Sequence, residues 1–133
     1  MAAAIEELAR RRHLRLRRYY HDEPVWDLTF LLPAGGAGKV SIFAISPSEV
    51  SLRASLWRDD YASAVRTVRR CRERLVGREG VEVALGVSEL VDVLLSEQCD
   101  GETTATSGYG DVWWRHSAEE FERMSTQGLE VAR

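Results

Sequence analysis

The sequence predicts an α+β fold: an antiparallel sheet of four to five strands with two to four helices, one of them packed on a face of the sheet. Three observations predict it. Residues 25–57 contain three runs in which apolar and polar side chains alternate. Short turns rich in glycine, proline or serine separate these runs. Residues 60–76 then place apolar side chains at helical spacing.

Length and composition limit the number of domains and the class of protein. The 133 residues are enough for one domain, 1–133, and too few for two ordinary ones. Hydrophobic residues make up 44% and charged residues 29%, which is typical of a globular protein and excludes a collagen-like repeat or a membrane bundle. No apolar run is long enough to cross a bilayer, and the charged first dozen residues do not resemble a signal peptide. A cytoplasmic location and no membrane partner are therefore predicted.

The first element is predicted as a helix beginning at residues 2–12, with its apolar side chains on one side. Two interpretations remain open beyond it. The helix can continue to about Tyr19, or a first strand can begin near His13, because Leu14 and Leu16 alternate with arginines. We favour the continuous helix, since arginine and leucine are good helix formers.

The three alternating runs cover residues 25–32, 40–46 and 50–57, with turns at 33–38 and 46–49. The first run predicts these inward-facing side chains: Trp26, Leu28, Phe30 and Leu32. The third run predicts these: Val50, Leu52, Ala54 and Leu56. Together the runs predict an antiparallel meander with one well-filled face.

Residues 60–76 are predicted to be a helix packed on that face. Asp59 or Asp60 can cap its start, and Gly77 can end it. The residues at helical spacing are Tyr61, Ala64 or Val65, Val68, Cys71 and Leu75. Two cysteines do not make a disulfide scaffold in a chain of this length, so Cys71 is predicted to be a buried, inert thiol.

The rest of the chain is assigned in order. Residues 81–85 are a candidate fourth strand, and a short helix follows from Ser88. Residues 99–110 are a loop or an irregular hairpin, and residues 111–116 are a candidate edge strand. A last helix is predicted from Ser117 to about Gln127, because Ser117 followed by Glu120 fits a capping box.

Charge is divided along the chain. Residues 1–78 contain 15 basic and 9 acidic residues, whereas residues 79–133 contain 3 basic and 12 acidic residues. The division can mark a surface that faces a partner, or two halves that attract each other within one fold. We favour the internal attraction.

No motif predicts a catalytic, metal-binding or cofactor-binding residue. The glycine-rich segment 35–39 lacks the spacing of a phosphate-binding loop and precedes a strand instead of a helix. The three histidines form no close metal pair: His13, His21 and His116. A catalytic pair assembled only by the fold, such as Cys71 with His116, remains open.

Trp113 and Trp114 carry the predicted partner-binding site. Neighbouring side chains on a strand point to opposite faces, so the core naturally takes only one of the two. The other tryptophan would then be exposed beside Tyr109 and Arg115, and Trp, Tyr and Arg are the residue types that dominate interface energetics. The predicted partner-binding residues are Tyr109, Trp113, Trp114 and Arg115.

These features favour a non-enzymatic protein-binding domain: an inhibitor, an immunity-type antitoxin or an accessory subunit. The site would combine an exposed aromatic with the acidic surface of the second half, which suits a basic protein partner. Two alternatives remain open. One is a nucleic-acid-binding module, for which we expect a basic groove lined by Arg15, Arg18, Tyr19 and Arg66. The other is a small enzyme whose site, with His21 or His116, forms only in three dimensions.

Overall fold

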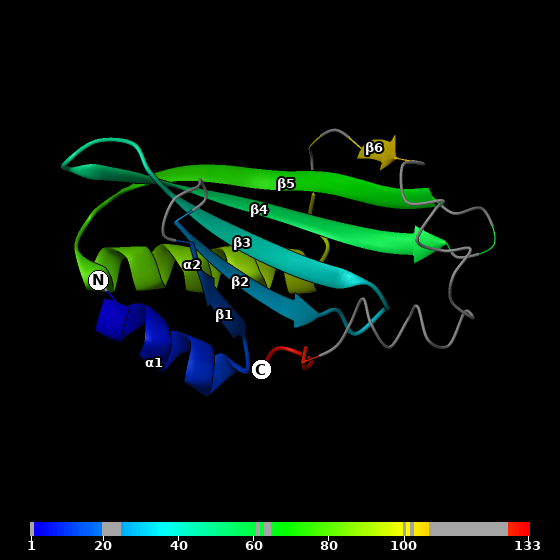
Figure 1. Ribbon diagram of the computed structural model, residues 1–133, viewed down its shortest axis with the longest axis horizontal. Coiled ribbons are helices and arrows are strands. Elements are labelled where there is room, and N and C mark those ends of the chain that lie inside the picture. Colours follow the sequence, from blue (N-terminus) through cyan, green and yellow to red (C-terminus); the bar gives the residue numbers. More distant parts are fainter. Residues whose placement is uncertain are drawn as a thin grey trace.

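The computed structural model describes residues 2–19, 25–60, 62, 65–99, 101 and 128–133, together with the backbone of 103–106. These residues form the following elements in chain order: α1 (Ala2–Arg12), β1 (Arg15–Arg18), β2 (Trp26–Leu31), β3 (Ala37–Ala44), β4 (Glu49–Asp60), β5 (Val65–Gly77), α2 (Gly80–Leu95) and β6 (Thr103–Thr106) (Figure 1).

The six strands of the described residues form one antiparallel sheet in the order β1-β2-β3-β4-β5-β6. Helix α2 packs against β3, β4 and β5, and α1 packs against α2 and β1, so both helices lie on the same side of the sheet (Figure 1). The α+β class, the antiparallel sheet and a helix on one face are confirmed. The sheet has one strand more than the four to five expected, because residues 103–106 pair with β5.

The meander over residues 25–57 is confirmed. Strands β2, β3 and β4 pair in register through Leu28, Val40 and Ala54. Every side chain predicted to face the core on 26–32 and 50–56 is buried. The alternation with period two therefore identified both the strands and the face that the helices cover, which we call the inner face.

Residues 60–76 are not a helix, and the prediction of one there was wrong. Residues 65–77 are β5, which pairs with β4 along nearly its whole length. Ala54 pairs with Arg72 but its neighbour Ser55 pairs with Arg70, so Cys71 is an extra residue in a β-bulge. A bulge shifts the alternation by one position, which turned a period of two into spacings that resemble a helix.

The helix that covers the sheet is α2, and it begins well before Ser88. Val81–Leu85 is its first part and not a fourth strand, which corrects both predictions. Val83 is fully buried, whereas Val81 and Leu85 are 68% and 61% exposed. The apparent alternation came from Val81 and Leu85, which are apolar but lie on the solvent side of an amphipathic helix.

The first helix ends at Arg12, so its predicted continuation to Tyr19 was wrong and the alternative of a strand was right. His13 takes the left-handed conformation (φ 60°), and the amide of Leu14 donates to the carbonyl of Ala9 at 2.9 Å. This closes the helix in the manner of a C-terminal cap. Strand β1 begins two residues later.

The contact between α2 and β4 is close because it passes over a glycine. A Cβ built on Gly86 would lie 2.6 Å from Cδ1 of Leu52 and 3.3 Å from Cγ1 of Val76. Gly86 lies in the buried stripe of the helix, which also contains Val83, Val87, Leu90, Val91 and Leu94. The absence of a side chain at residue 86 thus brings the helix axis close to the sheet.

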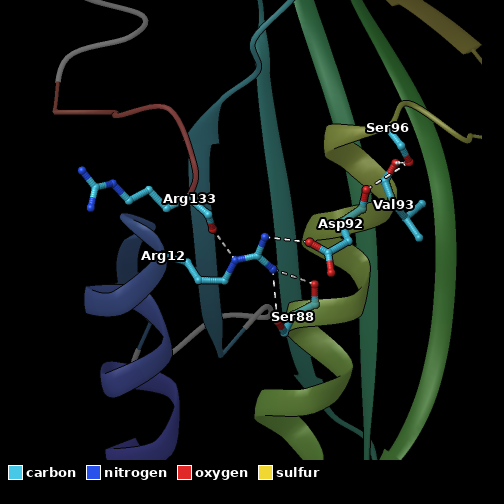
Figure 2. A network of polar contacts seen from close by, with 6 residues as sticks. All are labelled: Arg12, Ser88, Asp92, Val93, Ser96 and Arg133. Atoms are coloured by element: carbon cyan, nitrogen blue, oxygen red, sulfur yellow. Dashed lines mark hydrogen bonds and ion pairs between the residues drawn. The ribbon is translucent and has the colours of Figure 1, made fainter.

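Arg12 joins three parts of the chain (Figure 2). Its Nη1 donates to the carbonyl and to Oγ of Ser88, both at 3.0 Å, and its Nη2 donates to Oδ1 of Asp92 at 2.6 Å. Its Nε donates to the carbonyl of Arg133, and the amide of Arg133 donates to the carbonyl of Arg12 at 2.8 Å. The side chain of Arg12 is only 12% exposed, and its two bonds to Ser88 are partly buried, whereas Asp92 is 66% exposed.

Ion pairs connect the basic first half with the acidic second half. Arg12 pairs with Asp92, Arg58 with Glu97 and Arg74 with Glu89. His13 also lies 3.1 Å from Glu130, between Nδ1 and Oε2. Among the described residues, part of the divided charge therefore acts within the fold, as the favoured interpretation expects, while three further arginine pairs lie inside the first half.

Replacing Gly86 with valine should destabilise the protein by roughly 1–3 kcal/mol, because an overpacked core must move its neighbours. The loss should occur although valine has the better helix propensity. Leu85→Val, on the exposed side of the same helix, is the control and should melt close to the parent. Thermal denaturation followed by circular dichroism measures both. A Gly86→Val variant that melts at or above the parent temperature would contradict the close packing.

Replacing Arg12 with methionine keeps the length of the side chain and removes its donors. We expect a loss of roughly 2–3 kcal/mol in the free energy of unfolding, because several partly buried hydrogen bonds are broken together. Arg10→Met is the control. Arg10 is exposed, and its hydrogen bond to Glu7 only holds the pKa of that carboxyl below its ordinary value. Urea denaturation should leave the midpoint of the control unchanged; equal midpoints for the two variants would refute the role given to Arg12.

Candidate functional site

The sheet face opposite α2, which we call the outer face, contains a hollow of about 600 Å³ over β3, β4 and β5. Its volume falls in the range of small ligand sites. The residues that line it are Lys39, Ser41, Phe43, Arg53, Ala54, Ser55, Arg70, Cys71, Arg72, Glu73 and Gly101. Arg72 pairs with the inward-facing Ala54, so the basic side chains on the outer face are Lys39, Arg53 and Arg70. They outnumber the one acid of the lining, Glu73, and the hollow is electropositive.

A cross-strand row forms the centre of the hollow. Lys39 of β3 pairs with Ser55 of β4, and Ser55 pairs with Arg70 of β5. The three side chains therefore stand next to one another on the same face, with the two cations flanking the hydroxyl. The backbones of Lys39 and Arg70 are two strand spacings apart, a distance of about 10 Å.

Arg53 stands on β4, two residues from Ser55, and is held from two sides. Its guanidinium carbon lies 4.2 Å from the centroid of the Phe43 ring. Its Nε donates to Oε1 of Glu73 at 3.3 Å, and Oγ of Ser51 donates to the same oxygen at 2.9 Å. These contacts fix the direction of the guanidinium while 53% of the side chain stays exposed.

The bulge in β5 forms one wall of the hollow, and a disulfide anchors it. Cys71 is bonded to Cys99, the residue shortly after α2. The prediction that Cys71 is buried is confirmed, but the prediction of a free thiol was wrong. A Cβ on Gly101 would lie 2.0 Å from the carbonyl oxygen of Arg70, so only glycine fits against the bulge there.

No protein-family model matches the chain, and no curated protein or solved structure is significantly similar to it. The assignment of a site therefore depends on the residues of this chain alone.

The predicted partner-binding residues Tyr109, Trp113, Trp114 and Arg115 lie outside the described residues, as do His21 and His116. The predicted edge strand 111–116 and last helix 117–127 lie outside them as well. The described residues contain no group of three or more metal-ligating side chains that could hold an ion. Within the same ranges, no helix is long and apolar enough to span a bilayer.

The basic groove expected of a nucleic-acid-binding module does not form from the residues named for it. Arg15 and Arg18 stand on β1, whereas Arg66 stands on β5, with three strands between them. Arg66 also makes two bonds to Asp59, at 2.7 and 3.0 Å. The structure instead brings together three cations on neighbouring strands: Lys39, Arg53 and Arg70.

Sequence reasoning missed this set because its members are 14 and more residues apart and none belongs to a motif. Part of the signal was present in the alternation, since Arg53 occupies a polar position of the predicted strand 50–57, and Lys39 directly precedes the predicted strand 40–46. It also missed Asp27, which is only 6% exposed on the outer face between Arg17 and Ser41. Its Oδ1 has no hydrogen-bond partner among the described residues, so Asp27 is a buried carboxylate oxygen beside the hollow.

Replacing both cysteines with serine should lower the free energy of unfolding by roughly 3–4 kcal/mol, because the bond closes a loop with a sequence separation of 28. The parent should also lose this amount when a reductant is added during denaturation. The Cys71→Ser/Cys99→Ser variant is the control for the reductant, because it has no disulfide and its unfolding midpoint should not change when the reductant is added. Two reactive thiols in the unfolded, unreduced parent would show instead that the bond does not form.

Proposed function

We propose that this chain is a non-enzymatic protein-binding domain of the kind found in inhibitors, immunity-type antitoxins and accessory subunits. The observation that carries the proposal is the one-sided arrangement of the helices. Both α1 and α2 lie on the inner face, and no helix of the described residues covers the outer face. The outer face instead presents partly exposed aromatic and arginine side chains, the types enriched at protein interfaces: Phe43, Arg53, Trp57 and Arg66.

The charge of the partner is a separate part of the proposal. Glu89, Asp92 and Glu97 are paired with arginines of the first half. The prediction of a basic partner therefore depends on the other acids of the second half. Glu79 and Glu82 make no ion pair with an arginine among the described residues, and six acids lie outside the described residues: Asp100, Glu102, Asp111, Glu119, Glu120 and Glu122. Complementary charge at such acids would accelerate association with a basic protein.

The place where binding occurs also belongs to the proposal. A cytoplasmic location stays a prediction, and the Cys71–Cys99 bond counts against it, because disulfides are rare in the cytosol and persist in oxidising compartments. Trapping the thiols with an alkylating reagent in intact cells would decide this. Alkylation of both cysteines would support the cytosol, and protection of both would support an oxidising compartment.

The predicted partner site is tested by replacing Trp113 and Trp114 with alanine one at a time. Each variant's affinity for a partner, first recovered by affinity purification and then purified, is measured together with its melting temperature. We expect one of the two changes to weaken binding about thirty-fold, or about 2 kcal/mol, while the melting temperature stays near that of the parent.

Trp26→Ala is the matched control, because Trp26 is 6% exposed in the core. That change should cost roughly 3–5 kcal/mol of stability. If Trp113→Ala and Trp114→Ala both lower the melting temperature as Trp26→Ala does, the pair belongs to the core and the proposed partner site is wrong. Unchanged affinity in both variants would reject it as well.

A further inference from the structure

We propose that the hollow on the outer face binds an acidic segment of a protein partner, whose carboxylates are held by Lys39, Arg53 and Arg70. This inference rests on the proposed protein-binding function and assigns it a second surface, separate from the tryptophan pair. It also gives that surface a ligand chemistry, namely carboxylate side chains on an extended stretch of chain.

The first argument is that the cations of the hollow are available. Among the described residues, the side chains of Lys39 and Arg70 make no hydrogen bond or ion pair. Arginines elsewhere in the sheet and in α1 do, as the pairs of Arg12, Arg58 and Arg74 with acids show. Arg53 of the hollow is paired with Glu73, but the side chains of Lys39 and Arg70 are paired with no acid among the described residues.

The second argument is preorganisation. Nε of Arg53 donates to Glu73, and the plane of its guanidinium packs on the Phe43 ring. These contacts orient the two terminal nitrogens, whose N–H groups remain able to donate to a ligand. A guanidinium presents paired donors that match a carboxylate. Since the side chain is already held, little rotamer entropy is lost when a carboxylate binds.

The third argument is spacing. Lys39 and Arg70 flank Ser55, with about 10 Å between their backbones, and Arg53 stands two residues from Ser55 on β4. Alternate side chains of an extended chain lie about 7 Å apart, within reach of this triangle of long cations. The hydroxyls of Ser41 and Ser55 add donors between the charges.

An acidic protein segment fits better than a nucleic acid. The formal net charge of the chain is −3, and a phosphate backbone needs a basic surface along its whole length. A short acidic segment needs only the local field of the hollow, where three cations (Lys39, Arg53 and Arg70) outnumber Glu73 and the neighbouring Asp27. Phe43 offers an apolar contact for the methylene groups of glutamate side chains.

The test uses fluorescein-labelled hexaglutamate as the probe and fluorescence anisotropy at low salt as the readout. The main variant is Lys39→Gln/Arg70→Gln, which removes two cations that make no bond within the described residues. We expect it to weaken binding of the probe at least tenfold. The matched control, Arg10→Gln/Arg11→Gln, removes the same charge from α1 and should change affinity less than about twofold.

A second variant, Ser55→Asp, places an acid at the centre of the row and should abolish probe binding while retaining a cooperative melt. It keeps the assignment testable if the double variant does not fold. Absence of probe binding by the parent would overturn the inference. Equal weakening by the two charge-matched double variants would also overturn it, because binding would then follow net charge alone.

Two further outcomes distinguish this inference from nucleic-acid binding and from the proposed function. A single-stranded oligonucleotide that binds the parent more tightly than the probe near physiological salt, and is released by Lys39→Gln/Arg70→Gln, would replace the acidic segment with nucleic acid. The affinity of the probe can be the same for the parent and the hollow variants while Trp113→Ala or Trp114→Ala still weakens binding of the purified partner. In that case the hollow assignment fails and the proposed function stands.

Discussion

The packing of α2 on the inner face of β3, β4 and β5 is the contact on which the rest of the structure depends. It buries the helix stripe against the apolar side of the meander, and Gly86 allows the two to approach closely. Burial of apolar surface is the dominant favourable term in folding, and α2 together with the inner face of the meander supplies most residues of the buried core. Because the helices cover one face only, the polar positions of the same strands remain on the other face, and the outer hollow is a consequence of that one-sided burial.

The bulge at Cys71 connects this packing with the candidate site. It changes which side chains of β5 face outward, and so brings Arg70 into the row with Ser55 and Lys39. The bond to Cys99 fixes the bulge to the segment that leaves α2. A β-bulge is a usual means of redirecting a side chain next to a functional site. The hollow therefore depends on the same helix that fills the core, through a covalent link at its C-terminal end.

Much of the fold could be predicted from the sequence, and the exceptions have physical causes. The meander was predictable because its inner face is buried along every strand, which keeps the inward positions apolar at a period of two, although the middle run 40–46 also has apolar residues at outward positions, such as Phe43. Strand β5 was not, because the bulge breaks the alternation at Cys71 and its arginines hide which face is inward. The start of α2 was missed because Val81 and Leu85 are exposed apolar residues. The disulfide and the hollow join residues distant in the sequence, and the predicted tryptophan site lies outside the described residues.

The fold divides the basic residues into two sets with different surroundings. In one set, represented by Arg12, Arg58 and Arg74, each guanidinium meets an acid of the second half and holds two parts of the chain together. Pairs of this kind compensate charge inside the molecule without any partner. In the other set, Lys39 and Arg70 gather on one face with no acid opposite them among the described residues. Ser55 stands between them, with about 10 Å between their backbones. An anionic group bound there would be attracted by both cations, and this is the physical reason to look for an acidic ligand at the hollow.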